Sequence, residues 1–194
     1  MATLDNKSLI MNIGKIRSVR DAAFELADSK VYSAKTSFLN EFNSHIVTRE
    51  IDSGESSSNI SGTLGGYGNL FSFIGFNAGS NPTQAVRDLI EKIRIIKSSY
   101  FKVTKDGSIF TFKVSVPSMS KFENDTQMPW LSGRSWLLSI EKGISGFGYF
   151  ISKSLLGRSL GGIQSDEKIR SGSYSGTSYF TKMYSNFLRR INLK

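Results

Sequence analysis

The chain has 194 residues, of which 39% are hydrophobic and 21% charged, and a chain of this kind can bury a core within one domain. It contains no cysteine, which excludes disulfides, thiolate metal ligands and cysteine nucleophiles. Residues 1–97 carry 11 basic and 10 acidic residues, whereas residues 98–194 carry 14 and 6, so the net charge of +9 lies almost wholly in the second half. A basic segment of this kind can attract polyanions or an acidic protein surface. The alternative is a solvated basic face that only keeps the protein soluble.

Apolar residues recur at steps of three and four through the N-terminal third. They are Ile16, Val19, Ala23, Leu26, Val31, Ala34, Phe38 and Phe42. Because residues 15–45 contain no glycine or proline, this pattern predicts one amphipathic helix of about 40–45 Å. A helix of that length is long for a domain of this size, so we expect it either to brace a neighbouring subunit or to break in two.

The next two segments predict a strand and a long loop. Residues 46–52, IVTREID, alternate enough for a strand. Residues 53–69 contain five glycines and five serines, without a helical or strand period. The loop leads into an apolar patch, LFSFIGF, that either docks into a neighbouring subunit or forms a core strand. Its candidate interface residues are Leu70, Phe71, Phe73 and Phe76.

A second helix is predicted to begin at Asn81-Pro82. Asparagine can cap a helix, and proline suits the first helical position. Its apolar face would extend to about Lys97 and consist of Ala85, Leu89, Ile93 and Ile96.

A β-hairpin is predicted around Asp106-Gly107. This pair lies between Tyr100–Lys105 and Ser108–Val116, and an Asp-Gly pair between β-rich runs is a strong hairpin signal. The second strand alternates, with one apolar face made of Phe110, Phe112, Val114 and Val116.

Two tryptophans surround a predicted turn at Ser132-Gly133, and a further strand is predicted over Ser135–Ile140. Tryptophan and arginine are favoured at interfaces, which makes Trp130, Arg134 and Trp136 candidate interface residues. The alternative is that the tryptophans belong to the core beside a turn.

The C-terminal part predicts a second long loop and a last helix. Residues 143–176 contain eight glycines, and Thr177–Leu193 has an apolar side and a basic end. The chain is therefore predicted to be α+β, with a long N-terminal helix and further helices packed on a small, mainly antiparallel sheet. We expect one structural domain over residues 1–194, with extended Gly-rich loops at about 53–69 and 143–176.

Catalytic signals are weak. A lone histidine, His45, could act as a general base beside Asp52, but no G-x-S-x-G motif positions a serine nucleophile. The carboxylate pairs Glu123/Asp125 and Asp166/Glu167 lie in polar, turn-like segments. The glycine clusters do not precede a G-K-[ST] helix start, and the acids lack calcium-loop spacing. We therefore expect no enzyme activity, no cofactor and no metal.

Membrane insertion and secretion are not expected either. The apolar runs are far shorter than the roughly 18 residues of a membrane helix, and the first 15 residues lack a basic region followed by an apolar stretch. Nucleic-acid binding is the alternative function, because basic residues and aromatics are mixed in the second half. These basic residues are dispersed, and no known nucleic-acid-binding motif is present.

Taken together, several segments resemble the structural proteins of tailed bacteriophages, and the closest likeness is to the small neck and tail-completion proteins of the head–tail junction. The resemblance rests on the long N-terminal helix, SHIVTREI, SGTLGGYGNLFSFIGF, PWLSGRSWLLSIEKGISGFGYF and GRSLGGIQ. Such proteins place a long helix against a small antiparallel sheet and assemble into rings between the connector and the tail tube.

The resemblance implies a virion protein, assembled in the host cytoplasm, whose partners are copies of itself and the adjacent connector and tail proteins. It also implies non-specific contact with packaged DNA. Residues 53–76 would be a loop that spans subunits, Met128–Ile140 a sheet-and-interface element, and residues 143–176 a second contact arm. Many such proteins are shorter than this chain, so its Gly-rich arms would be additions.

Overall fold

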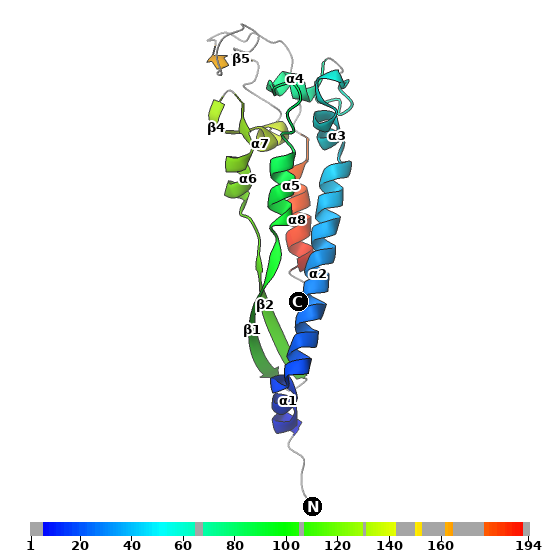
Figure 1. Cartoon of the computed structure of the whole chain (residues 1–194), viewed down its shortest axis with the longest axis vertical. Coiled ribbons are helices and arrows are strands. Elements are labelled where there is room, and N and C mark those ends of the chain that lie inside the picture. Colours follow the sequence, from blue (N-terminus) through cyan, green and yellow to red (C-terminus); the bar gives the residue numbers. More distant parts are fainter. Residues whose placement is uncertain are drawn as a thin grey trace, which may run out of the picture.

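The structure is a computed structural model, and it describes residues 6–64, 68–104, 107–129, 131–142, 150–152, 162–164 and 177–191. Figure 1 shows an elongated molecule with a broad end built of several helices and a narrow end built of two helices and a β-ribbon. The elements in chain order are α1 (Asn6–Lys15), α2 (Arg17–Ser44), α3 (Ile46–Asp52), η1 (Gly54–Ser56), α4 (Leu70–Ile74), α5 (Gln84–Glu91), β1 (Arg94–Thr104), β2 (Gly107–Ser115), α6 (Met119–Asp125), β3 (Gln127–Met128), β4 (Leu131–Ser135), α7 (Trp136–Glu141), β5 (Phe150–Ser152), β6 (Gly162–Gln164) and α8 (Phe180–Ile191).

The long amphipathic helix is confirmed as α2, which runs without interruption for 28 residues. Its buried side consists of Val31, Ala34, Phe38 and Phe42, all from the predicted apolar set. The helix ends where His45 adopts an extended backbone, with φ −65° and ψ 137°. A single extended residue, Ile16, separates α2 from α1.

The predicted strand over residues 46–52 is wrong, because this segment is the helix α3. Val47, Thr48, Glu50 and Ile51 are all buried, and their spacing of one, three and four residues is helical rather than alternating. His45 also caps this helix, since its Nδ1 accepts a hydrogen bond from the backbone N–H of Val47 at 3.3 Å.

The predicted strand over Ser135–Ile140 is also wrong, because Trp136–Glu141 form α7. The Ser135 side chain caps α7 by accepting a hydrogen bond from the N–H of Leu138 at 3.4 Å. The three buried side chains, Trp136, Leu137 and Ile140, therefore have the spacing of one face of a helix rather than the alternation of a strand.

The second predicted helix exists as α5, but its bounds differ. It begins at Gln84, after a turn at Asn81–Thr83, and it ends at Glu91. Ile96 therefore belongs to β1 rather than to the helix, and the buried helix residues are Val86, Leu89 and Ile90.

The Asp106-Gly107 hairpin is confirmed as the antiparallel pair β1–β2, here called the ribbon, with Thr104 opposite Gly107. The predicted apolar face is the half-buried one, whereas Ile109, Thr111, Lys113 and Ser115 are exposed. Among the described residues, the strands form three separate two-stranded antiparallel sheets, β1–β2, β3–β4 and β5–β6, rather than one sheet. The α+β class is confirmed.

The core fills the broad end, where the second half of α2 packs against α3, α5 and α8. Phe38 lies at its centre, with its ring centroid 5.6 Å from that of Phe180 and 5.2 Å from that of Phe187. The last predicted helix is confirmed as α8, which buries Phe180, Met183 and Phe187.

The narrow end, here called the stalk, consists of α1, residues 17–32 of α2 and the ribbon. It has two layers, and Phe24 of α2 meets Phe112 of β2 with ring centroids 5.8 Å apart. Among the described helices, none is long and apolar enough to cross a membrane.

Candidate functional site

The first polar centre is the carboxylate of Glu50, which is fully buried on α3. Its Oε1 accepts hydrogen bonds from Asn59 Nδ2 at 2.9 Å and from the N–H of Leu70 at 2.7 Å. Its Oε2 accepts one from the N–H of Ser61 at 2.7 Å. A buried carboxylate is stable only when it is hydrogen-bonded in this way.

These bonds tie the Gly/Ser-rich segment to the core. Asn69 adds to them, because its Nδ2 donates to the backbone carbonyls of Glu55 at 3.0 Å and Ser57 at 2.9 Å. The predicted loop over residues 53–69 is therefore folded back on α3 in its described part, which excludes residues 65–67. The sequence analysis missed Glu50, although an acid three residues after Val47 and one before Ile51 could have marked it.

The candidate interface residues of the apolar patch lie inside the subunit. Leu70 and Phe71 are buried in the core, and Phe73 and Phe76 pack against it. Asn69 caps this short helix, α4, through a hydrogen bond from the N–H of Ser72 at 2.8 Å. Gly75 ends it with φ 86°, a conformation that favours glycine. The core interpretation of this patch therefore describes the structure, although the element is a helix rather than a strand.

The tryptophan segment is divided between core and surface. Trp136 is buried, and its ring meets that of Phe76 edge-on at 5.7 Å. Trp136 is thus a core residue rather than an exposed anchor. Arg134 is exposed on β4, and Trp130 lies outside the described residues. Of the seven candidate interface residues, only Arg134 is exposed among those that the structure describes.

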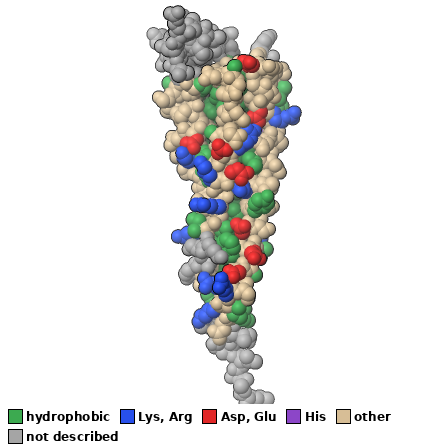
Figure 2. Space-filling model, viewed as in Figure 1, with side chains coloured by type: hydrophobic (Ala, Val, Ile, Leu, Met, Phe, Trp, Pro, Cys, Tyr) green, Lys and Arg blue, Asp and Glu red, His purple; other side chains and the backbone are tan. Residues whose placement is uncertain are grey.

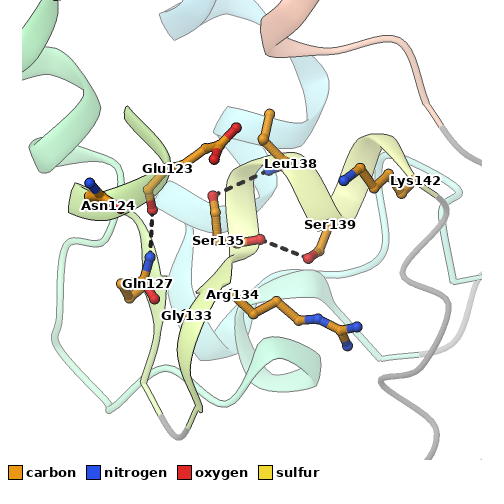
Figure 3. Close-up of a pocket in the computed structure, with 9 residues that line it drawn as sticks. All are labelled: Glu123, Asn124, Gln127, Gly133, Arg134, Ser135, Leu138, Ser139 and Lys142. Atoms are coloured by element: carbon orange, nitrogen blue, oxygen red, sulfur yellow. Dashed lines mark hydrogen bonds between the residues drawn. The ribbon is translucent and has the colours of Figure 1, made fainter. Parts of the chain in front are cut away.

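Arg134 lies at the edge of a polar hollow of about 290 Å³ between α6, the β3–β4 hairpin and α7 (Figure 3). Its walls are Glu123, Asn124, Gln127, Gly133, Arg134, Ser135, Leu138, Ser139 and Lys142. Several of these side chains bond to the backbone of the hollow itself. Gln127 Nε2 donates to the carbonyl of Glu123 at 2.7 Å, and Ser139 Oγ to that of Ser135 at 2.7 Å. Arg134 and Lys142 can bind an anionic group, but the walls contain no histidine to act as a general base.

His45 has a structural position between α2 and α3. Its ring packs against Tyr179 with centroids 4.7 Å apart, and its Nδ1 is engaged by Val47. Burial lowers the pKa of His45 below its usual value, whereas a backbone hydrogen bond at Ser178 acts in the opposite direction. Asp52 is bound by Thr83 and Arg87, so it does not orient His45.

The lowered pKa of His45 predicts a pH dependence. Burial disfavours the protonated imidazole in the folded state, so the unfolded state binds more protons just below pH 6.5. We expect the free energy of unfolding to fall as the pH decreases from about 7 through the pKa of the unfolded histidine. His45→Asn keeps a capping acceptor and removes this titration. Urea unfolding of both proteins between pH 5 and 8 measures the difference, and identical pH profiles would contradict it.

A stalk surface also carries exposed apolar and charged side chains. Among the described residues, eight large hydrophobic side chains are exposed, and six of them lie on the stalk. These six are Ile13, Ile16, Leu26, Tyr32, Ile96 and Ile109. Figure 2 shows acidic side chains grouped over the middle and lower part of α2, with basic side chains beside them on the side of the ribbon.

No protein-family model, curated protein or solved structure matches this chain. Among the described residues, no group of three or more His, Asp and Glu side chains could hold a metal ion. We therefore infer function from the shape of the chain and the placement of its own residues.

Proposed function

We propose that this chain is a structural protein of a tailed-phage virion that forms a ring at the head–tail junction and joins the connector to the tail. In this proposal it is a neck or tail-completion protein, assembled in the host cytoplasm, with neighbouring connector-side and tail proteins as partners. Its activity is the closure of a symmetric ring by complementary subunit surfaces.

The observation that carries the proposal is the stalk. When a helix packs on a two-stranded ribbon, only one face of each layer is buried. An isolated two-stranded ribbon is only marginally stable in water unless something else packs on it. The opposite faces remain exposed, with Leu26 63% and Tyr32 66% accessible on α2 and Ile109 50% accessible on β2. Exposed apolar side chains on layers that lack further packing support association with another protein.

The rest of the molecule supports an assembly role. The core is confined to the broad end, so the stalk projects from an already stable body (Figure 1). A rigid projection of this kind can reach an adjacent protein or a neighbouring copy. The polar centres described above hold the subunit together: Glu50 fixes a loop, and His45 caps a helix.

The test is the location of the chain in purified particles. Quantitative mass spectrometry gives the copy number of the chain in complete particles and in tail-defective and head-defective assembly intermediates. Electron microscopy of the same samples gives its position. We expect a fixed copy number per particle, a multiple of the ring symmetry, and density at the junction between connector and tail. Absence of the chain from washed particles would contradict the proposal.

The alternative is a nucleic-acid-binding accessory protein, and the basic outer face of the ribbon is the observation that favours it. Binding through phosphates alone weakens steeply with salt, because each neutralised phosphate releases counterions. A salt titration of DNA binding by the isolated subunit separates the two functions. Tight DNA binding at low salt that falls steeply with added salt supports the alternative, and no binding by the isolated subunit supports the ring protein.

A further inference from the structure

The outward face of the ribbon is basic and apolar. Residues that are paired across the ribbon share a face, so Arg94, Ile96, Lys102, Ile109 and Lys113 all point away from α2, opposite the face that carries the contact with Phe112. Ile96 is 45% exposed and Ile109 50%, and all three basic residues are exposed. Within the described part of the chain, none of these three cations forms an ion pair. This surface is called the ribbon face.

The stalk part of α2, residues 17–32, carries a complementary surface. Asp21, Glu25, Asp28 and Tyr32 follow a spacing of four, three and four residues, which places them on one side of the helix. Arg17 lies 3.6 Å from Asp21, but Glu25 and Asp28 have no ion-pair partner among the described residues. Tyr32 is 66% exposed beside these acids. This surface is called the acidic stripe.

The two surfaces lie at the same level of the stalk. Glu25 follows Phe24, and Lys113 follows Phe112, and these two phenylalanines are in contact across the layers. Copies that are related by rotation about an axis parallel to the stalk keep equivalent residues at the same height along that axis. Such a rotation can therefore place the ribbon face of one copy against the acidic stripe of the next.

The two surfaces are of similar length, and Lys102 lies at the end of the ribbon face nearer α1, where Ser108 bonds to the carbonyl of Ile10. Asp21 and Asp28 are about 10 Å apart along α2 at about 1.5 Å per residue. Lys102 lies opposite Ile109, and Lys113 is four residues further along β2. The two lysines are therefore about 13 Å apart at about 3.3 Å per residue.

We propose that the occupant of the ribbon face is the acidic stripe of a second copy of this chain, in a head-to-tail contact between parallel stalks. Lys113 and Ile96 of one copy lie at the height of Glu25 of the next, and Lys102 lies toward Asp21, at the end of the ribbon face nearer α1. This inference rests on the proposed ring function and assigns its subunit interface. The contact is heterologous, so successive copies form a closed ring when the rotation closes.

Charge reversal tests the pairing. The ribbon variant carries Lys102→Glu and Lys113→Glu, and the stripe variant carries Glu25→Lys and Asp28→Lys. Each variant sets like charges against one another, and we expect its self-association constant in sedimentation velocity to fall by about 10- to 100-fold. The chain with all four changes restores opposite charges, so it should associate nearly as well as the unaltered chain. An equimolar mixture of the two variants should also associate.

Lys182→Glu on α8 is the matched control, because this lysine is exposed on the broad end away from both surfaces. Circular dichroism establishes that each variant is folded before its association is measured. Loss of association in the ribbon variant, without recovery in the chain with all four changes, would overturn the inference.

Cysteine cross-linking captures the contact directly, because the chain has no cysteine of its own. The pair Glu25→Cys with Lys113→Cys should give a ladder of disulfide-linked oligomers after mild oxidation. Each single variant contains one cysteine and can give no species larger than a dimer. A double variant that yields only monomer and dimer would contradict the head-to-tail contact.

The outcomes separate this interface from the proposed function. If the unaltered chain forms rings and both charge variants still form them equally well, the interface is wrong and the ring remains. If the unaltered chain is a monomer and gives no ladder, the ring and the interface are both wrong. If the ribbon variant loses DNA binding but assembles normally, the ribbon face binds DNA instead of a second copy, and the inference is overturned.

Discussion

Replacing Glu50 with alanine is expected to lower the free energy of unfolding by about 3–5 kcal/mol, because one buried and two partly buried donors lose their acceptor at once. Asn59 and the N–H groups of Ser61 and Leu70 all bond to this carboxylate. Each buried donor that is left unsatisfied costs about 1–3 kcal/mol.

Glu50→Gln should cost less, about 1–3 kcal/mol, because the amide keeps one acceptor oxygen and places an NH₂ group against a donor. Glu55→Gln is the matched control, since Glu55 is an exposed acid on η1, and we expect a change within about 0.5 kcal/mol. Urea unfolding at pH 7 measures all three. A loss of less than about 1 kcal/mol for Glu50→Ala would mean that the carboxylate does not hold the loop.

The Glu50 network also marks what the sequence could not predict. The Gly/Ser composition of residues 53–69 indicated an irregular segment, but composition carries no information about a distant carboxylate that organises it. IVTREID was mistaken for a strand because a seven-residue segment with β-branched residues is ambiguous between the two periods. Burial of the adjacent pairs Val47–Thr48 and Glu50–Ile51 fits only the helical period, and that burial depends on tertiary packing.

Truncating Trp136 to alanine is expected to lower the free energy of unfolding by about 3–5 kcal/mol, the usual cost of removing a large buried aromatic side chain. Trp136 is 1% exposed and packs edge-on against Phe76. The loss would include both the transfer free energy of the indole and the cavity that remains.

Arg134→Ala in the adjoining strand β4 is the control, because Arg134 is exposed, and we expect a change within about 0.5 kcal/mol. Thermal unfolding followed by circular dichroism compares the two. If Trp136→Ala were as stable as the unaltered protein but failed to assemble, Trp136 would act at an interface rather than in the core.

The candidate site was less predictable than the fold. Long periodic segments identified α2 and α8, and the Asp-Gly pair identified the ribbon, because each of these signals is local. Large aromatics such as Phe71 and Trp136 suit a core and an interface equally well, so their burial could not be read from type and spacing. Ile109 was present in the predicted strand alternation, whereas Ile96 was assigned to the second helix, and only the structure revealed that both lie on one face of the ribbon and are about half exposed.

The most direct test of the assembly claim is electron microscopy of the purified, full-length protein at several concentrations. The proposed function predicts closed rings with one subunit number, in which the stalks lie parallel and the broad ends form one rim. A particle that remains a single elongated subunit at every concentration, alone and with connector or tail intermediates, would contradict it.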